Sequence, residues 1–259
     1  NWVVAGSNRG YLALWDVRFQ KLVKLWQHES GAPVNRLGTS FAALPGNNER
    51  EAKPYVVMGC GLNEATVFDI SRGSCSHCFR VLDPALCYAD QSALPGNITS
   101  LPVLREVNPN SEKSYRTNGV ASVINQRVPP PEPSIQSFTG RIGNNGDNFL
   151  ATAGSDGSIH YWNFSSASKC FTVCSNKASR PIYEKVGRSN TPGTLFVCRQ
   201  LPAPKLNEIP STNIPKVLQK GTIRPDNCHK DSILDIKKLD YPMKGILSCS
   251  RDNSIKFWR

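Results

Sequence analysis

Residue types that could perform nucleophilic chemistry occur near the C-terminal end of the sequence. His229 precedes Ser248 and Asp252, and the stretch "SCSRDNSIKFWR" continues to Trp258. In a nucleophilic triad the His takes the Ser proton while the Asp orients the His ring. The same residue types also form buried hydrogen-bond networks that hold strands together. The elements that carry these four residues therefore decide between a catalytic and a structural role.

A second pattern that could do chemistry is "CSHC", Cys75–Cys78, which encloses His77. Two thiolates at this spacing can share one tetrahedral zinc ion, but the ion needs a second pair of ligands. The nearest other cysteines, Cys60 and Cys87, do not form such a pair. We therefore expect no metal site, with zinc at this pattern as the open alternative.

The nine cysteines are odd in number and scattered along the chain. Cys60, Cys198 and Cys249 lie inside apolar runs that look like strands. Reduced and buried thiols fit this distribution better than a disulfide framework does.

No other pattern in the chain indicates catalysis. The sequence contains no Gly-rich loop followed by a strand Lys, no His-Arg-Asp loop and no Asp-Phe-Gly segment. "GRIGNNG", Gly140–Gly146, is expected to follow no strand and to open no helix, which makes it a surface loop rather than a phosphate cradle. We expect no catalytic residue and no cofactor in this chain.

The composition favours a basic protein without a dedicated nucleic-acid arm. The chain has 259 residues and a net charge of +11, yet its Lys and Arg residues form no run of five. No apolar run reaches about 18 residues, and the start shows no secretory signal. The chain opens directly on an apolar run without an initiator Met. We therefore expect it to be a piece of a longer protein.

The elements that carry these residues recur along the chain. Each copy has an apolar run with small residues, a polar turn and an alternating strand, which together predict a β-hairpin. The four copies span Val3–Asp16, Val56–Asp69, Leu150–Asn163 and Ile246–Arg259. Further strands are predicted at Lys21–His28, Ser74–Leu82 and Ser232–Leu239. Such a unit buries both faces of its sheet only by stacking against similar units in a ring.

This pattern resembles the WD40 repeat of β-propellers. The resemblance implies, in each blade, a structural tetrad of a His, a Ser or Thr, a turn Asp and a Trp. In the last hairpin the tetrad is His229, Ser248, Asp252 and Trp258. The third hairpin matches at Thr152, Asp156 and Trp162, without a matching His before it.

The first two hairpins depart further from the pattern. The first keeps Trp15 and Asp16 but has Arg9 in place of the turn Asp. The second keeps Asp69, has Phe68 in place of Trp, and has His28 as a plausible His before the blade. Under this resemblance, Trp258→Ala costs about 3–5 kcal/mol of stability as the loss of a core Trp, and it removes no catalysis.

The resulting fold expectation is an all-β, partial WD40 β-propeller of about four blades out of about seven, with long Pro-rich inserts. The expected organisation is two blades over 1–82, a largely disordered insert over 83–147, blade strands over 148–174, an insert with some strand over 175–227 and the last blade over 228–259. Each insert is expected to add one or two strands. An incomplete ring would expose sheet edges, so the isolated chain is expected to aggregate or to fold poorly.

Three stretches narrow the resemblance: Gly10–Gln20, Gly61–Asp69 and His229–Ile236. In this order they look like the C-terminal propeller of the protein-kinase-like regulatory subunits of class III phosphatidylinositol 3-kinase complexes, which act in vacuolar protein sorting. The match covers about half of the chain. The resemblance implies an upstream serine/threonine-kinase-like domain and helical repeats, with ATP bound only there.

The same resemblance implies partners and a location. The expected partners are the lipid-kinase catalytic subunit and its coiled-coil autophagy and endosomal subunits. The expected location is cytoplasmic and peripheral on endosomal and autophagic membranes, without nucleic acid. A WD40 adaptor of an unrelated complex, in ubiquitin ligation or RNA processing, is the alternative reading.

Overall fold

The computed structural model describes residues 1–28, 31–42, 44, 52–61, 63–81, 104–108, 133–142, 148–175, 181–190, 193–201 and 227–259. Within these residues the chain is almost entirely β-strand, with one short 3₁₀ turn, η1 (Ala167–Lys169). None of the described helical structure is long and apolar enough to cross a membrane.

The strands form four sheets, which we name blades 1 to 4 in chain order. Blade 1 contains, in spatial order, β1 (Trp2–Gly6), β2 (Tyr11–Asp16), β3 (Lys21–His28) and β8 (Leu104–Glu106). Blade 2 contains β4 (Val34–Ala42), β5 (Lys53–Cys60), β6 (Glu64–Asp69), β7 (Ser74–Val81), β14 (Gly193–Leu201) and β13 (Ile182–Asn190). Blade 3 contains β9 (Ile135–Arg141), β10 (Phe149–Gly154), β11 (Ile159–Asn163) and β12 (Phe171–Cys174). Blade 4 contains β15 (Ile233–Leu239), β16 (Gly245–Ser250) and β17 (Ile255–Trp258).

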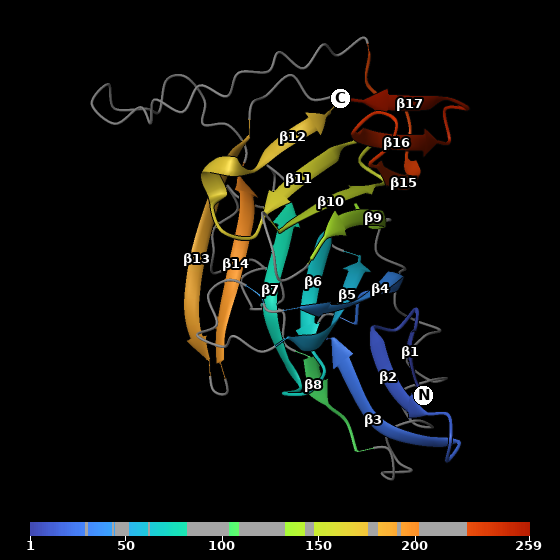
Figure 1. The fold of residues 1–259 in the computed structure, drawn as a ribbon, viewed down its shortest axis with the longest axis vertical. Helices are drawn as coiled ribbons and strands as arrows, with labels where there is room; N and C mark the ends of the chain where they lie inside the picture. Colours follow the sequence, from blue (N-terminus) through green and yellow to red (C-terminus); the bar gives the residue numbers. More distant parts are fainter. Residues whose placement is uncertain are drawn as a thin grey trace, which may run out of the picture.

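The four blades follow one another in an arc (Figure 1). Strands β4, β9 and β15 lie along its inner side, and the β13–β14 hairpin lies on its outer side. This is the arrangement of a partial WD40 propeller, and the fold class predicted from the sequence is confirmed.

Each predicted hairpin forms around a residue with left-handed backbone at the same place in the turn. These residues are Gly10, Asn63, Gly157 and Asn253, with φ of 75°, 52°, 68° and 62°. Glycine adopts this conformation without strain, and asparagine tolerates it better than most other residues. The repeated turn therefore explains why all four copies fold as hairpins in the same register.

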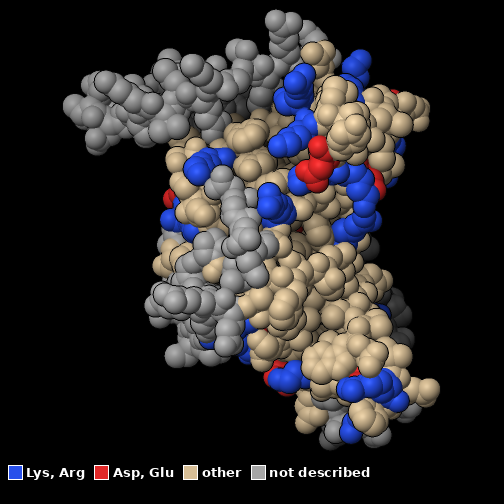
Figure 2. All heavy atoms as spheres, in the orientation of Figure 1, with Lys and Arg blue, Asp and Glu red and all other residues tan. Residues whose placement is uncertain are grey.

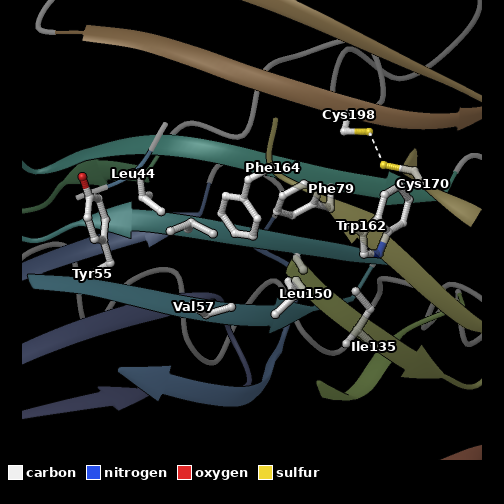
Figure 3. Close-up of a cluster of buried hydrophobic side chains, with 12 residues drawn as sticks. Leu44, Tyr55, Val57, Phe79, Ile135, Leu150, Trp162, Phe164, Cys170 and Cys198 are labelled. Carbon is white, nitrogen blue, oxygen red and sulfur yellow. Dashed lines mark hydrogen bonds between the residues drawn. The ribbon is translucent and has the colours of Figure 1, made fainter. Parts of the chain in front are cut away.

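Neighbouring blades pack through apolar side chains that alternate along their strands. The cluster between blades 2 and 3 is the largest, and Figure 3 shows Phe79, Phe164 and Trp162 meeting Leu150 and Ile135 within it. A second cluster joins blades 1 and 2 around Trp26, Met58 and Phe68, and a third joins blades 3 and 4 around Ile159, Ile233 and Ile236. The core is thus a series of layers between successive sheets.

Close contact between blades depends on a glycine. A Cβ on Gly59 would stand 2.9 Å from Cγ2 of Ile135, which belongs to blade 3. Such a contact is shorter than any side chain tolerates without movement. The absence of a side chain at Gly59 therefore lets β5 and β9 approach each other.

Strands from the two predicted inserts complete the sheets. β8 and β9 fall within 83–147, and β13 and β14 fall within 175–227. β8 pairs antiparallel with β3, and β14 pairs parallel with β7, so blade 2 has six strands. Most of the remaining residues of the inserts lie outside the described part of the chain.

The charged side chains show no continuous basic surface on the face in view. Figure 2 shows several groups of Lys and Arg over the upper half of this face and another at its lower end, with uncharged residues between them. This distribution matches the scattered placement of basic residues in the sequence.

Candidate functional site

The four residue types of the last hairpin meet in one hydrogen-bonded network. His229 Nδ1 lies 3.1 Å from Asp252 Oδ2, and His229 Nε2 lies 2.7 Å from Ser248 Oγ. Trp258 Nε1 donates to the same Ser248 oxygen at 2.7 Å. We name these four side chains the blade-4 network. It joins the segment before β15 to both strands of the β16–β17 hairpin.

Asp252 carries a negative charge in this network. The pKa of Asp252 lies below its usual range, chiefly because the Ser254 hydroxyl donates to its carboxylate, which outweighs the opposing effect of burial. The ionised carboxylate lies against His229 Nδ1, and the Ser248 hydroxyl lies against Nε2 on the other side of the ring. Because Ser248 Oγ also accepts from the Trp258 indole, one hydroxyl connects the His and Trp side chains.

Burial makes this arrangement unsuitable for attack on a substrate. The side chains of Ser248 and His229 are 1% and 0% exposed. A nucleophile needs an open approach to the scissile carbonyl and donors for the developing oxyanion. Ser248 is enclosed by Trp258 and His229, so the blade-4 network can hold strands together but cannot receive a substrate.

Trp258 is less buried than its role in the pattern suggested. Its side chain is half-buried, because β17 is the last strand of blade 4 in the described residues and has no strand beyond it. The cost of Trp258→Ala should therefore fall below that of a fully buried Trp. Trp162, which is 0% exposed, is the tryptophan to which the larger figure applies.

Blade 3 divides the same residue types into two separate interactions. Trp162 Nε1 donates to Thr152 Oγ1 at 2.8 Å, as in blade 4. Asp156 instead lies 3.3 Å from His160 Nε2 and accepts from Asn63 Nδ2 of blade 2 at 3.0 Å. The histidine that contacts Asp156 lies inside the third hairpin, whereas the WD40 pattern places it before the blade, so His160 was not predicted.

Blade 2 replaces the tetrad with an ion cluster. At the places of the Ser or Thr and the Trp stand Met58 and Phe68, both 0% exposed. Glu64 Oε1 lies 3.0 Å from His28 Nε2, and Glu64 Oε2 accepts from Arg80 Nε at 2.6 Å. His28 is thus brought into blade 2, as the sequence suggested, but its partner Glu64 was not foreseen.

The charge of Glu64 depends on this cluster. Burial alone would raise the pKa of the carboxyl group, but the Arg80 guanidinium and the His28 bond outweigh it and lower the pKa to about 2. Glu64 is therefore ionised, and its pairing with Arg80 compensates two charges that are hidden from water. The cluster joins β3 of blade 1 to β6 and β7 of blade 2.

Blade 1 contains the least complete version of the pattern. Ala5 stands at the place of the Ser or Thr, and the Trp15 side chain is 42% exposed. Asp16 accepts from Arg18 and from Trp2 Nε1, and the Arg18 bonds are the main reason why the pKa of Asp16 falls to about 2. The Arg9 departure noted in the sequence leaves this blade without a turn carboxylate.

The residue that follows the aromatic position has one role in three blades. Asp16, Asp69 and Asn163 each accept a hydrogen bond from the backbone N–H two residues later, at 3.0, 2.9 and 2.9 Å. Such Asx turns stabilise the tight connection to the following strand. The repeat-defining Asp is thus a turn residue here rather than a ligand for a substrate.

The Cys75–Cys78 pattern lies in β7 of blade 2. Within the described residues, no group of three or more His, Cys, Asp or Glu side chains is placed to hold a metal ion. His77 is buried against Phe79, Phe164 and Phe196, and burial lowers its pKa to about 3.

The expectation that Gly140–Gly146 follows no strand is wrong. Gly140 and Arg141 are the last residues of β9. Tertiary pairing with β10 forms this strand although its sequence lies close to a Pro-rich stretch. Residues 143–147 lie outside the described part of the chain.

Comparison with known proteins agrees with this architecture. The model of the family "WD domain, G-beta repeat" matches residues 221–259, which include all of blade 4. The chain is 28% identical over 267 aligned positions to serine/threonine-protein kinase VPS15 of Arabidopsis thaliana, covering 100% of this chain and 17% of that protein. It is 29% identical over 165 positions to putative serine/threonine-protein kinase VPS15 of Komagataella pastoris, covering 62% of this chain and 11% of that protein.

The chain thus spans less than a fifth of the length of the curated relatives that it matches. The family match identifies blade 4 as a WD40 repeat, and the four stacked sheets extend the same architecture along the chain. The chain is therefore a partial WD40 propeller that resembles a region of the VPS15 serine/threonine-protein kinases.

Proposed function

We propose that this chain is the non-catalytic scaffold propeller of a regulatory, serine/threonine-kinase-like subunit of a class III phosphatidylinositol 3-kinase complex, acting in endosomal sorting and autophagy. The observation that carries the proposal is the similarity to the Arabidopsis VPS15 kinase along the whole chain. Rigid β-propellers present loops and edges on which partners dock, which suits a scaffold.

The polar residues support a scaffold rather than an active site. The blade-4 network, the Thr152–Trp162 pair and the Glu64 cluster are all directed into the sheets. Each connects strands of one blade or of two neighbouring blades. Residues that could have supplied nucleophilic or acid–base chemistry are thus used to stabilise the fold.

The proposed partners are the lipid-kinase catalytic subunit and the coiled-coil subunits that direct the complex to endosomal and autophagic membranes. Membrane association would be peripheral and would pass through the complex. ATP would be bound by an upstream kinase-like domain and not by this chain. No direct contact with nucleic acid is proposed, since the Lys and Arg residues in view are dispersed.

The test is co-purification of the epitope-tagged natural protein from cells, followed by a lipid-kinase assay with phosphatidylinositol. We expect the eluate to contain the catalytic subunit and to form phosphatidylinositol 3-phosphate. Trp162→Ala, which removes a fully buried side chain, should reduce this recovery, whereas Tyr241→Ala, at an 88% exposed position, is the matched control.

The proposal fails if the purified protein brings down no lipid-kinase activity. Recovery of ubiquitin-ligase subunits or RNA-processing factors instead would favour the unrelated WD40 adaptor. A Trp162→Ala protein with unchanged recovery would show that an intact blade 3 is not needed for assembly.

A further inference from the structure

Two cysteines from different blades bring their sulfur atoms close together. Cys170 follows η1 in blade 3, and Cys198 lies in β14 of blade 2. Their Sγ atoms are 3.8 Å apart, at the edge of the cluster between the two blades (Figure 3). Both side chains are buried, with exposures of 0% and 2%.

The surroundings of Cys170 favour a negative charge on its sulfur. The backbone N–H of Asn163 donates to Cys170 Sγ at 3.2 Å. The Lys185 ammonium group is held nearby, where it donates to the carbonyl oxygens of Phe164 and Ser165. A positive charge and an N–H donor both favour the thiolate, which is the form of cysteine that attacks an oxidant.

The two thiols are also unequal. The pKa of Cys170 is lowered, first by the hydrogen bond with Cys198 and further by the Asn163 N–H and the Lys185 charge, against the effect of burial. The pKa of Cys198 is raised by the same hydrogen bond and by burial. Cys170 is therefore the thiol that ionises more readily and the better nucleophile of the pair, whereas Cys198 keeps its proton and can donate it in the hydrogen bond between the two sulfurs.

The backbone around both cysteines is held in place by other bonds. Tyr183 of β13 bonds Thr172 of β12 at 2.7 Å and donates to Gln200 of β14 at 3.1 Å. Cys198 itself stands opposite Phe79 in the parallel pairing of β14 with β7. A disulfide requires the two sulfur atoms to be roughly 2 Å apart. Rotation of the side chains about their Cα–Cβ bonds would bring the sulfurs closer than their present 3.8 Å.

We propose that Cys170 and Cys198 are a redox-sensitive modification site, which a peroxide converts into a reversible disulfide between blade 3 and the outer hairpin of blade 2. The Cys170 thiolate attacks one peroxide oxygen, the O–O bond breaks, and the departing hydroxide takes up a proton to become water. The Cys198 sulfur then attacks the resulting sulfenic acid, the S–S bond forms, and a second water leaves. In total, two thiols and one hydrogen peroxide give one disulfide and two waters.

The disulfide would tie two sheets that, in the described part of the chain, meet through the side chains of the cluster between blades 2 and 3. It would cross-link residues 28 positions apart in the chain. A covalent loop of this size raises stability because it restricts the unfolded chain. Reduction by a dithiol would restore the two thiols and remove the added stability.

The test treats the purified natural protein with hydrogen peroxide, blocks remaining thiols with iodoacetamide and identifies the products by mass spectrometry. We expect a mass loss of about 2 Da, a linked peptide pair containing Cys170 and Cys198, and a midpoint of thermal unfolding raised by about 5 °C. Dithiothreitol should reverse all three changes.

Variants separate this site from general oxidation. Cys170→Ser and Cys198→Ser should each abolish the linked peptides and the thermal shift. Cys249→Ser is the matched control, because Cys249 is only half-buried and would react before Cys170 if exposure alone decided reactivity. This control should behave as the unaltered chain does.

Three results would overturn the proposal. They are oxidation that stops at sulfinic or sulfonic acid on Cys170, a disulfide that joins other cysteines, or a linked pair without a thermal shift. Should a serine variant fail to fold, peptide mapping of the unaltered chain with and without peroxide still decides between the proposal and these alternatives.

Discussion

A single hydroxyl group at the centre of blade 2 shows what a buried polar atom costs. Thr66 Oγ1 has no hydrogen-bond partner within the described residues, although its side chain is 0% exposed. Thr152 Oγ1, in blade 3, is equally buried but accepts a bond from Trp162. The two residues have the same shape and differ in whether the hydroxyl is satisfied.

We predict opposite effects when each threonine is replaced by valine. Thr66→Val should raise the free energy of unfolding by about 1 kcal/mol, because an unpaired polar group is removed from the core. Thr152→Val should lower it by about 1–2 kcal/mol, because the Trp162 indole N–H loses its acceptor. Urea unfolding followed by tryptophan fluorescence measures both, and effects of the same sign would contradict this account.

The Glu64 cluster joins three strands, β3 of blade 1 and β6 and β7 of blade 2. The pKa of Glu64 is about 2 in the folded chain against 4.5 for an ordinary glutamate. A carboxyl group with a lowered folded pKa adds stability above its unfolded pKa and loses that contribution as the pH falls towards its folded pKa.

The expected pH dependence follows from this shift. Stability on the order of 3 kcal/mol should be present above about pH 4.5 and should be lost progressively towards about pH 2. The control is the double variant Glu64→Leu with Arg80→Met, which removes both charges without leaving either one buried alone. Urea unfolding at several pH values should show a shallower acid slope for the double variant, and an equal slope would refute the assignment.

The sequence predicted these elements better than the contacts between them. The hairpins were predictable because each depends on local signals, such as the Asp156-Gly157 turn and the alternation that follows it. The blade-4 network was expected because the last hairpin resembles the WD40 repeat, whose tetrad positions hold His229, Ser248, Asp252 and Trp258 here. The Asn63–Asp156 hydrogen bond joins residues 93 positions apart, so no local sequence pattern predicts it.

Two other features escaped prediction for the same physical reason. Glu64 and Arg80 were not singled out in the sequence, because a short stretch does not show that a neighbouring blade will cover the charges. The insert over 175–227 was expected to contain some strand, but no local signal shows that β14 pairs in parallel with β7 of blade 2. Pairing across sheets is set by the whole fold.

The molecule as a whole is held together by the packing of each blade against the next. Gly59 permits β5 to approach β9, and we predict that Gly59→Ala lowers the free energy of unfolding by about 1–3 kcal/mol because its Cβ meets Ile135. In a double-mutant cycle, Ile135→Ala should cost less in the Gly59→Ala background than in the unaltered chain. Additive effects would show that the two side chains do not meet.

The parallel pair β7–β14 changes how the chain could be divided. Repeats that touch only their neighbours can be removed one at a time from an end. Here the hairpin that completes blade 2 is supplied by sequence beyond blade 3, so the second and third repeats are interleaved rather than consecutive. A protein cut after β12 would leave β7 as an open strand edge, and a boundary chosen from the repeat spacing alone would separate two halves of one sheet.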